Sequence, residues 1–156
     1  MNRISAIRNI TNQNPNSAII ISNGLSSREA NYFINNNRTF YMLHAMGEAL
    51  SIGMGMAMLN KKLRVVVIDG DYNAIMGSAS WHNLTACKNL KYFILSNRLS
   101  QTTGSQKVPS LSVPTKFKKY INIISIKGKK FSTPNPESPT KIKNKFKNWL
   151  KINNKI

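Results

Sequence analysis

Short β-branched runs alternate along the chain with longer amphipathic segments. Four of the runs predict strands, because each is rich in Val, Ile, Phe or Tyr and most are bounded by turn residues. They are SAIIIS (17–22), TFYML (39–43), LRVVVI (63–68) and LKYFIL (90–95). A fifth run, YINIISI (120–126), alternates as a last strand. The run at 63–68 is nearly continuous, which is typical of a strand buried on both faces of a parallel sheet.

The segments between the strands carry helix signals. Ser26 and Glu29 have the spacing of a capping box, which predicts a helix over 27–34 with Ser26 as its cap. The segment 44–62 repeats small residues at every fourth position, so one face of this helix can pack close to a sheet. These small residues are Ala45, Ala49, Gly53 and Ala57.

Two further helices complete the alternation. The segment 74–88 is weakly amphipathic, and a last helix begins at Pro139, with Ser138 as its N-cap. Between them, the polar segment 98–115 predicts a long loop. Strands that alternate with helices form βαβ units, whose strands are parallel. The predicted fold class is therefore α/β, a three-layer α/β/α domain with a mostly parallel sheet.

Length and composition are consistent with one domain. The chain has 156 residues, 41% of them hydrophobic, which suits one core and argues against disorder. The predicted organisation is an N-terminal extension (1–16), the domain (17–152) and a short tail (153–156). No apolar run reaches the roughly 18 residues of a membrane span. With no signal peptide and the single cysteine Cys87, a cytoplasmic protein without a membrane partner is expected.

The charge of the chain raises the question of a nucleic-acid partner. Its 23 Lys and Arg residues exceed its 5 acidic residues, for a net charge of +18. Lys residues are interleaved with Asn throughout, however, and no aromatic stacking pattern accompanies them. Nucleic-acid binding is therefore the less favoured function, and the Lys-rich side of the last helix is expected to be a solvated face.

Polar residues follow two of the predicted strands. The run 63–68 leads into Asp69-Gly70-Asp71, and the run 90–95 leads into Ser96-Asn97. If these parallel strands are neighbours, the Asp71 carboxylate and the Asn97 amide oxygen meet at one edge of the sheet. Both are hard ligands that suit Mg²⁺. Gly70 would leave room for a phosphate group, and the following helix would point its positive end toward it. The alternative is that Asp-Gly-Asp is only a turn and an N-cap.

A family resemblance bears on this choice. Gly70-Asp71 is followed by 25 residues and Asn97, which resembles the thiamine-diphosphate motif. The stretches NGLSSRE, YMLHAMGEALSIGMGMAML, RVVVIDGD, FILSN and TTGSQ occur in the order found in the diphosphate-binding domain of phosphonopyruvate and sulfopyruvate decarboxylases. The similarity extends over about residues 17–106. It implies the thiamine-diphosphate-binding fold, with thiamine diphosphate and Mg²⁺ as cofactors.

The resemblance also implies roles for particular residues. The expected metal ligands are Asp71, Asn97 and the backbone carbonyl of Leu99. The expected contacts to the diphosphate are Gly70, Tyr72 and Asn73, and those to the aminopyrimidine end are Ala45, Met46 and Gly47. The expected substrate loop contains Ser100, Thr102, Thr103, Gly104 and Gln106. Asp69 is expected to act only in the local geometry of the turn.

In the family, a second domain supplies the catalytic glutamate, and this chain is too short to contain that domain. No catalytic residue is therefore expected in this chain. A pyrimidine-binding, α-type partner, a hetero-oligomer and a small 2-oxo acid substrate are implied.

The chain also departs from the family pattern. Tyr72 stands in place of a glycine, Ser96 in place of an asparagine, His44-Ala45 in place of Gly-Ser, and Ser100 in place of a histidine. The segment 106–120 is too short for a further helix and strand, so the fold is expected to be shortened there. Two alternatives to an active subunit stay open: a catalytically inactive remnant and a basic nucleic-acid-binding protein.

Overall fold

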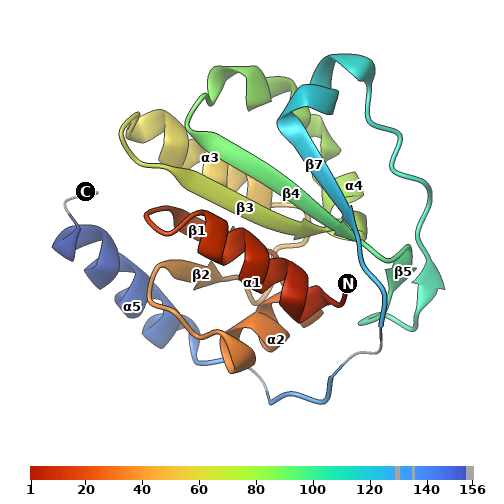
Figure 1. Ribbon diagram of the computed structural model, residues 1–156, viewed down its shortest axis with the longest axis horizontal. Helices are drawn as coiled ribbons and strands as arrows, with labels where there is room; N and C mark the ends of the chain where they lie inside the picture. Colours follow the sequence, from red (N-terminus) through yellow and green to blue (C-terminus); the bar gives the residue numbers. More distant parts are fainter. Residues whose placement is uncertain (129–130, 135, 154–156) are drawn as a thin grey trace.

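Five parallel strands form the central sheet, in the order β2-β1-β3-β4-β7 (Figure 1). The structure, a computed structural model, describes residues 1–128, 131–134 and 136–153. All four strand pairings are parallel, so the predicted α/β class is confirmed. The strands are β1 (Ala18–Ile21), β2 (Thr39–Tyr41), β3 (Val65–Gly70), β4 (Leu90–Ser96) and β7 (Ile121–Ser125).

Helices cover both faces of this sheet, which gives the expected three layers (Figure 1). One face carries α1 and α2, and the other carries α3 and the 3₁₀ segments η1 and η2. Their bounds are α1 (Arg3–Gln13), α2 (Leu25–Phe33), α3 (Ala49–Leu59), η1 (Ser78–Ala86) and η2 (Thr115–Tyr120).

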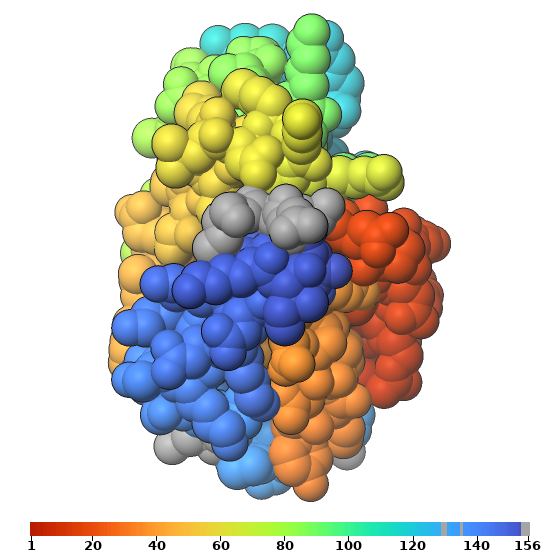
Figure 2. All heavy atoms as spheres, turned by 90° about the vertical axis from the view of Figure 1, so that its left-hand side faces the viewer, coloured from red at the N-terminus to blue at the C-terminus, as the bar shows by residue number. Residues whose placement is uncertain are grey.

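Four shorter or peripheral elements complete the domain. The helix α4 (Asp71–Met76) follows β3 directly, and a small antiparallel ribbon pairs β5 (Leu99–Ser100) with β6 (Gln106–Lys107). The last helix, α5 (Pro139–Ile152), packs against the edge strand β2. Figure 2 shows α5 in blue on this side of the molecule, with α3 in yellow above it.

The central position of β3 in the sheet explains why its sequence is apolar without alternation. Val65 and Val67 point into the core beneath α3, whereas Val66 and Ile68 point into the core beneath α1 and α2. All four side chains are at most 1% exposed. A central strand of a three-layer domain has no solvent face, so both sets of alternate positions must be apolar.

The small-residue face of the second predicted helix lies against β3. Ala49, Gly53 and Ala57 are buried, and a Cβ atom at Gly53 would overlap the side chain of Val67. The helix starts later than predicted, however. The backbone of Ala45 and Gly47 has positive φ (61° and 85°), which is incompatible with a right-handed helix, so 45–47 forms a turn before α3.

The predicted capping box is wrong. The helix α2 begins at Leu25, its N-cap is Gly24, and no side chain caps it. The hydroxyl of Ser27 donates instead to the carbonyl oxygens of Ile21 and Ser22, at 3.0 and 2.9 Å. Glu29 cannot cap the helix, because its side chain is fully buried beside Arg3.

The predicted helix 74–88 is two segments. The helix α4 starts earlier, at Asp71, and ends at Met76, and η1 continues the chain as a 3₁₀ helix. Gly77 separates the two segments, and a Cβ atom there would overlap the carbonyl oxygen of Gly47. The contact between these two glycines is long-range, and a local helix pattern contains no sign of it.

The prediction for the C-terminal helix is confirmed, whereas the N-terminal segment contains a helix that was not predicted. The prediction that Ser138 caps α5 is confirmed, since its hydroxyl accepts from the Lys141 N–H at 3.4 Å. Residues 1–16, in which no element was predicted, contain α1, and its Ile4, Ile7 and Ile10 are buried.

The segment between β4 and β7, which the structure describes throughout, contributes no strand to the central sheet. This agrees with the expected shortening. In the part of the chain that the structure describes, none of the helices combines the length and apolarity needed to cross a bilayer.

Candidate functional site

The carboxyl ends of β3 and β4 lie side by side at one edge of the sheet. These strands are neighbours, and Gly70 is in register with Leu95. The residues that follow, Asp71 and Asn97, therefore emerge at the same place, as the sequence pattern requires. Asp71 is 4% exposed, so its carboxylate lies at the base of a depression and not on the outer surface.

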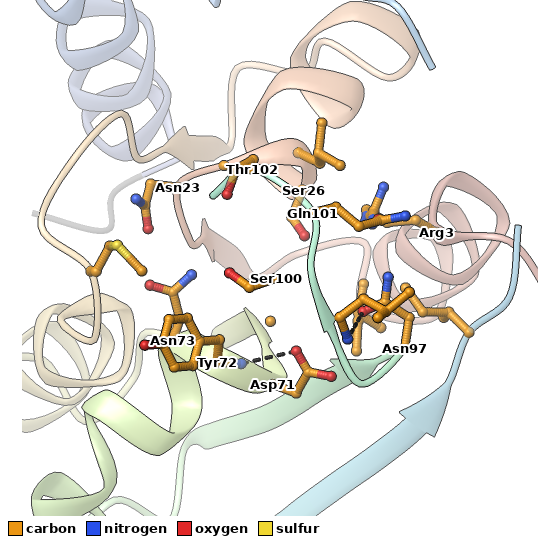
Figure 3. A pocket seen from close by; sticks show the side chains of 17 residues that line it. Arg3, Asn23, Ser26, Asp71, Tyr72, Asn73, Asn97, Ser100, Gln101 and Thr102 are labelled. Carbon is orange, nitrogen blue, oxygen red and sulfur yellow. Dashed lines mark hydrogen bonds between the residues drawn. The ribbon is translucent and has the colours of Figure 1, made fainter. Parts of the chain in front are cut away.

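Three neighbouring donors hold the Asp71 carboxylate. Its Oδ1 accepts from the Tyr72 N–H at 2.9 Å (Figure 3). Its Oδ2 accepts from the Ser96 hydroxyl at 2.9 Å and the Arg98 N–H at 2.7 Å. Asn97 Oδ1 accepts from the Leu99 N–H at 3.1 Å. The carboxylate of Asp71 and the amide of Asn97 are thus held in fixed orientations.

The turns that follow three of the strands have unusual backbone geometry. Gly24 follows β1 with φ 86°, Ala45 and Gly47 follow β2, and Arg98 follows β4 with φ 58°. A positive φ is unfavourable for Ala and Arg and occurs where surrounding structure imposes it. Tight turns at this edge bring the backbone of three loops around one depression.

A pocket occupies this depression, and nine of the predicted site residues line it. They are Met46, Gly70, Asp71, Tyr72, Asn73, Asn97, Leu99, Ser100 and Thr102. Figure 3 shows Asn23, Ser26 and Thr102 on one side of the pocket and Asp71, Tyr72 and Asn97 on the other.

Two of the other predicted site residues lie beside this pocket. Thr103 and Gln106 line a neighbouring cavity that shares Met46, Tyr72 and Ser100 with it. Ala45, Gly47 and Gly104 line neither of these two cavities.

Gly47 and Asn73 connect two parts of the site. The Gly47 N–H donates to Asn73 Oδ1 at 3.1 Å, and Gly77 packs directly on the Gly47 backbone. These contacts hold the 45–47 turn against α4. Gly47 itself does not line the pocket, but these contacts hold the turn from which Met46 lines it.

Sequence reasoning missed several residues of the pocket. They are Arg3, Asn23, Gly24, Leu25, Ser26 and Gln101. A signal was available for part of this set, because a strand, an Asn-Gly turn and a helix start in order are typical of anion binding at a helix N-terminus. The sequence carries no comparable signal for Arg3, which reaches the pocket from α1.

Asp69 lies behind the pocket and not in it. Its Oδ1 accepts from the Gly70 N–H at 3.0 Å, and its Oδ2 accepts from the Tyr92 hydroxyl at 3.1 Å. Burial raises the pKa of this carboxyl from 3.8 to about 6. Hydrogen bonds from Ser22, Tyr92 and Gly70 oppose the rise, and the charge of Asp71 adds to it by a smaller amount. Asp69 thus lies within β3 and not in the turn after it, and its bond from Tyr92 joins β3 to β4.

The pocket suits a diphosphate with a divalent cation. A Cβ atom at Gly70 would have no neighbour closer than Asn73 Nδ2 at 4.0 Å, so the space next to its backbone is open. The uncapped N-terminus of α2 faces the same space, where its free N–H groups can bind an anion.

One carboxylate, one amide oxygen and a nearby carbonyl suit Mg²⁺, which retains water and phosphate oxygens as ligands. Within the described ranges, no cluster of three or more His, Cys, Asp and Glu side chains offers a different metal site.

These features define a class of protein: a doubly wound α/β domain that binds a phosphorylated cofactor at the carboxyl ends of its parallel strands. The family described as "Thiamine pyrophosphate enzyme, C-terminal TPP binding domain" matches residues 16–150. The chain belongs to this family of thiamine-diphosphate-binding domains, and the resemblance seen in its motifs is confirmed.

Three individual relatives within this similarity are decarboxylases by name. The chain is 38% identical over 152 residues to "Sulfopyruvate decarboxylase subunit beta" of Methanocaldococcus jannaschii, which covers 95% of this chain and 77% of the relative. It is 41% identical over 108 residues to the protein of the same name from Methanothermobacter thermautotrophicus, covering 68% of this chain and 58% of the relative. It is 36% identical over 114 residues to "Phosphonopyruvate decarboxylase" of Streptomyces viridochromogenes, covering 71% of this chain but only 28% of the relative.

Proposed function

We propose that this chain is the thiamine-diphosphate- and Mg²⁺-binding subunit of a 2-oxo acid decarboxylase that acts on a substrate such as sulfopyruvate or phosphonopyruvate. The observation that carries the proposal is the position of Asp71 and Asn97 at adjacent strand ends, in a pocket faced by the uncapped N-terminus of α2. The names of the relatives described above support the same reaction.

In this proposal, the residues of the chain hold and orient the cofactor. Asp71, Asn97 and the Leu99 carbonyl are the protein ligands of Mg²⁺, and Gly70, Tyr72 and Asn73 line the diphosphate. The turn of Ala45, Met46 and Gly47 lies against the aminopyrimidine end. When bound, thiamine diphosphate supplies the electron sink for loss of CO₂ from a 2-oxo acid. Ser100, Thr102, Thr103, Gly104 and Gln106 form the loop next to the substrate.

A partner completes the active site. The proposed partner is a pyrimidine-binding, α-type subunit that contributes the catalytic glutamate and buries the cofactor in a hetero-oligomer. Two relatives are named as beta subunits, which supports a separate partner chain. Among the residues that the structure describes, no acid other than Asp71 lines the cofactor pocket, which is consistent with a glutamate from elsewhere.

The test is release of CO₂ by the complex formed on co-expression with a pyrimidine-binding partner. Sulfopyruvate, phosphonopyruvate and pyruvate are supplied as substrates with thiamine diphosphate and Mg²⁺. We expect activity in the wild-type complex and its loss in Asp71→Ala. The matched control is Glu48→Gln, an exposed acid at the start of α3, which should keep full activity. Equal activity in wild type and Asp71→Ala would refute the role of Asp71.

A cofactor that binds without any turnover would favour an inactive remnant. The exposed ring of Tyr72, which lines the pocket where the family carries a glycine, motivates this second candidate. Isothermal titration with thiamine diphosphate separates binding from catalysis.

A further inference from the structure

A second cavity opens beside the cofactor pocket and shares part of its wall. Asn23, Gly24, Met46 and Thr102 line both spaces, so the two are continuous at these residues. The second cavity lies between the first turns of α2, the end of β2 and the loop that follows β5. The residues that line only this second cavity are Arg28, Met42, Leu43, His44 and Pro136. Thr103 lines it as well as the cavity that contains Gln106.

The polar lining of this cavity is suited to an anion. Arg28 supplies a guanidinium group, His44 an imidazole and Thr102 a hydroxyl group, and none of the described lining residues is acidic. An arginine presents several N–H donors in a planar fork that matches the oxygens of a phosphonate or sulfonate. His44 can donate an N–H in either protonation state.

The guanidinium of Arg28 has no partner among the described residues that would compete with a ligand. Within residues 1–128, 131–134 and 136–153, its side chain forms no hydrogen bond and no ion pair, whereas Arg3 is bonded to Glu29 and Gln101. Glu137, the acid nearest in sequence to the Pro136 wall, is already paired with Lys141 and Lys145. The cavity therefore carries an unneutralised positive charge.

Apolar residues make up the remaining wall. Met42 is buried, and Met42, Leu43 and Pro136 surround the polar groups with side chains that do not compete for a ligand. Arg28 and His44 are themselves exposed, so an anion can reach them from solvent.

We propose that this second cavity selects the substrate: Arg28, with His44 and Thr102, binds the second anionic group of a 2-oxo acid, while its keto carbon faces the cofactor pocket. This inference rests on the proposed decarboxylase function. It deepens that function by assigning specificity for dianionic over monoanionic 2-oxo acids to this chain and not to its partner.

The first test measures kcat and KM of the co-expressed complex with sulfopyruvate, phosphonopyruvate and pyruvate. Arg28→Gln should raise KM for the two dianionic acids by about 10- to 100-fold, the range expected for a lost charge-assisted hydrogen bond. It should leave kcat/KM for pyruvate, which lacks the second anionic group, unchanged. Arg8→Gln, on the exposed side of α1, is the matched control and should leave all three substrates unaffected.

An equal loss for pyruvate and for the dianionic acids would overturn the inference, as would no loss at all. His44→Gln should shift the same two KM values in the same direction, by a smaller factor.

The second test does not depend on catalysis. The full chain is titrated with methanesulfonate and methylphosphonate, and the shifts of the Thr102 and Thr103 amides and of the Arg28 Nε–H are followed by NMR. We expect saturable shifts in the wild type that are absent in Arg28→Gln. Shifts that match those of NaCl at equal ionic strength, or that persist in the variant, would overturn the anion site.

The two tests separate the two proposals. If the wild-type complex decarboxylates none of the three acids, the proposed function fails, and the titration still decides whether the cavity binds an anion.

Discussion

Arg3 Nη2 donates a 2.6 Å hydrogen bond to Gln101 Oε1 and so joins the start of α1 to the loop at the edge of the cofactor pocket. Arg3 Nη1 simultaneously donates to Glu29 Oε1 at 2.7 Å, and the Glu29 side chain is fully buried. Burial raises the pKa of Glu29, and the Arg3 charge opposes that rise. Arg3 therefore neutralises a buried acid and orients a pocket residue at the same time.

Arg3→Met should loosen the pocket loop and destabilise the fold. It leaves Glu29 buried without its cation, which we expect to lower the free energy of unfolding by about 3 kcal/mol. Amide hydrogen exchange over residues 99–107 should become faster than in the wild type. Gln101→Ala is the comparison, because it should speed exchange in the same loop with little loss of stability. Unchanged exchange in both variants would show that the contact does not order the loop.

Asp69 should make stability fall as pH rises. The folded chain binds the Asp69 proton more tightly than the unfolded chain, since burial raises the pKa from 3.8 to about 6. Its contribution is complete below about pH 4 and is lost as pH rises through about 6, a change of about 3 kcal/mol.

Asp69→Asn cannot ionise at this position. Relative to the wild type, its free energy of unfolding should therefore improve by about 3 kcal/mol between pH 4 and pH 8. Urea unfolding without Mg²⁺ measures both proteins, with Glu48→Gln as control. A constant difference across this pH range would contradict the prediction.

Two glycines of α3 should respond oppositely to alanine. A Cβ atom at Gly53 would overlap Val67, so Gly53→Ala should destabilise the chain by about 1–3 kcal/mol through overpacking. A Cβ atom at Gly55 would meet no described atom within 4 Å, so Gly55→Ala should stabilise the helix by about 0.5–1 kcal/mol. Thermal unfolding of both variants checks the sign, and a loss of stability in Gly55→Ala would show that its face of α3 is not free.

Ser96 should tune the metal site through Asp71. Its hydroxyl donates to Asp71 Oδ2, so Ser96→Ala removes a group that orients the proposed ligand. Loss of such a partner typically weakens metal affinity by about 10- to 100-fold. Titration of the complex with Mg²⁺ in the presence of thiamine diphosphate measures the change, and EDTA should release the cofactor from the wild type. The exposed Ser112→Ala is the control. Equal Mg²⁺ affinity in Ser96→Ala and wild type would contradict the orienting role.

Local sequence patterns predicted those features that depend on the residues of one strand or helix alone. The apolar run at 63–68 predicted a strand buried on both faces, and Ser138 with Pro139 predicted the start of α5. The neighbouring position of Asp71 and Asn97 was predictable too, because parallel strands place their carboxyl ends at the same edge.

The features that the sequence did not predict depend on contacts between distant segments. The 45–47 turn, the break at Gly77 and the burial of Glu29 beside Arg3 each depend on a partner far away in sequence. Periodicity cannot report such a partner, because it records only which face of an element is apolar.

The succession of strands and helices, the class of fold and the acid-amide pair thus follow from alternation and from the residues after each strand. Tertiary structure alone brought Arg3 to the pocket and opened the cavity at Arg28. The physical reason is that a pocket is lined by residues from several loops. Those loops come together only after the sheet has assembled.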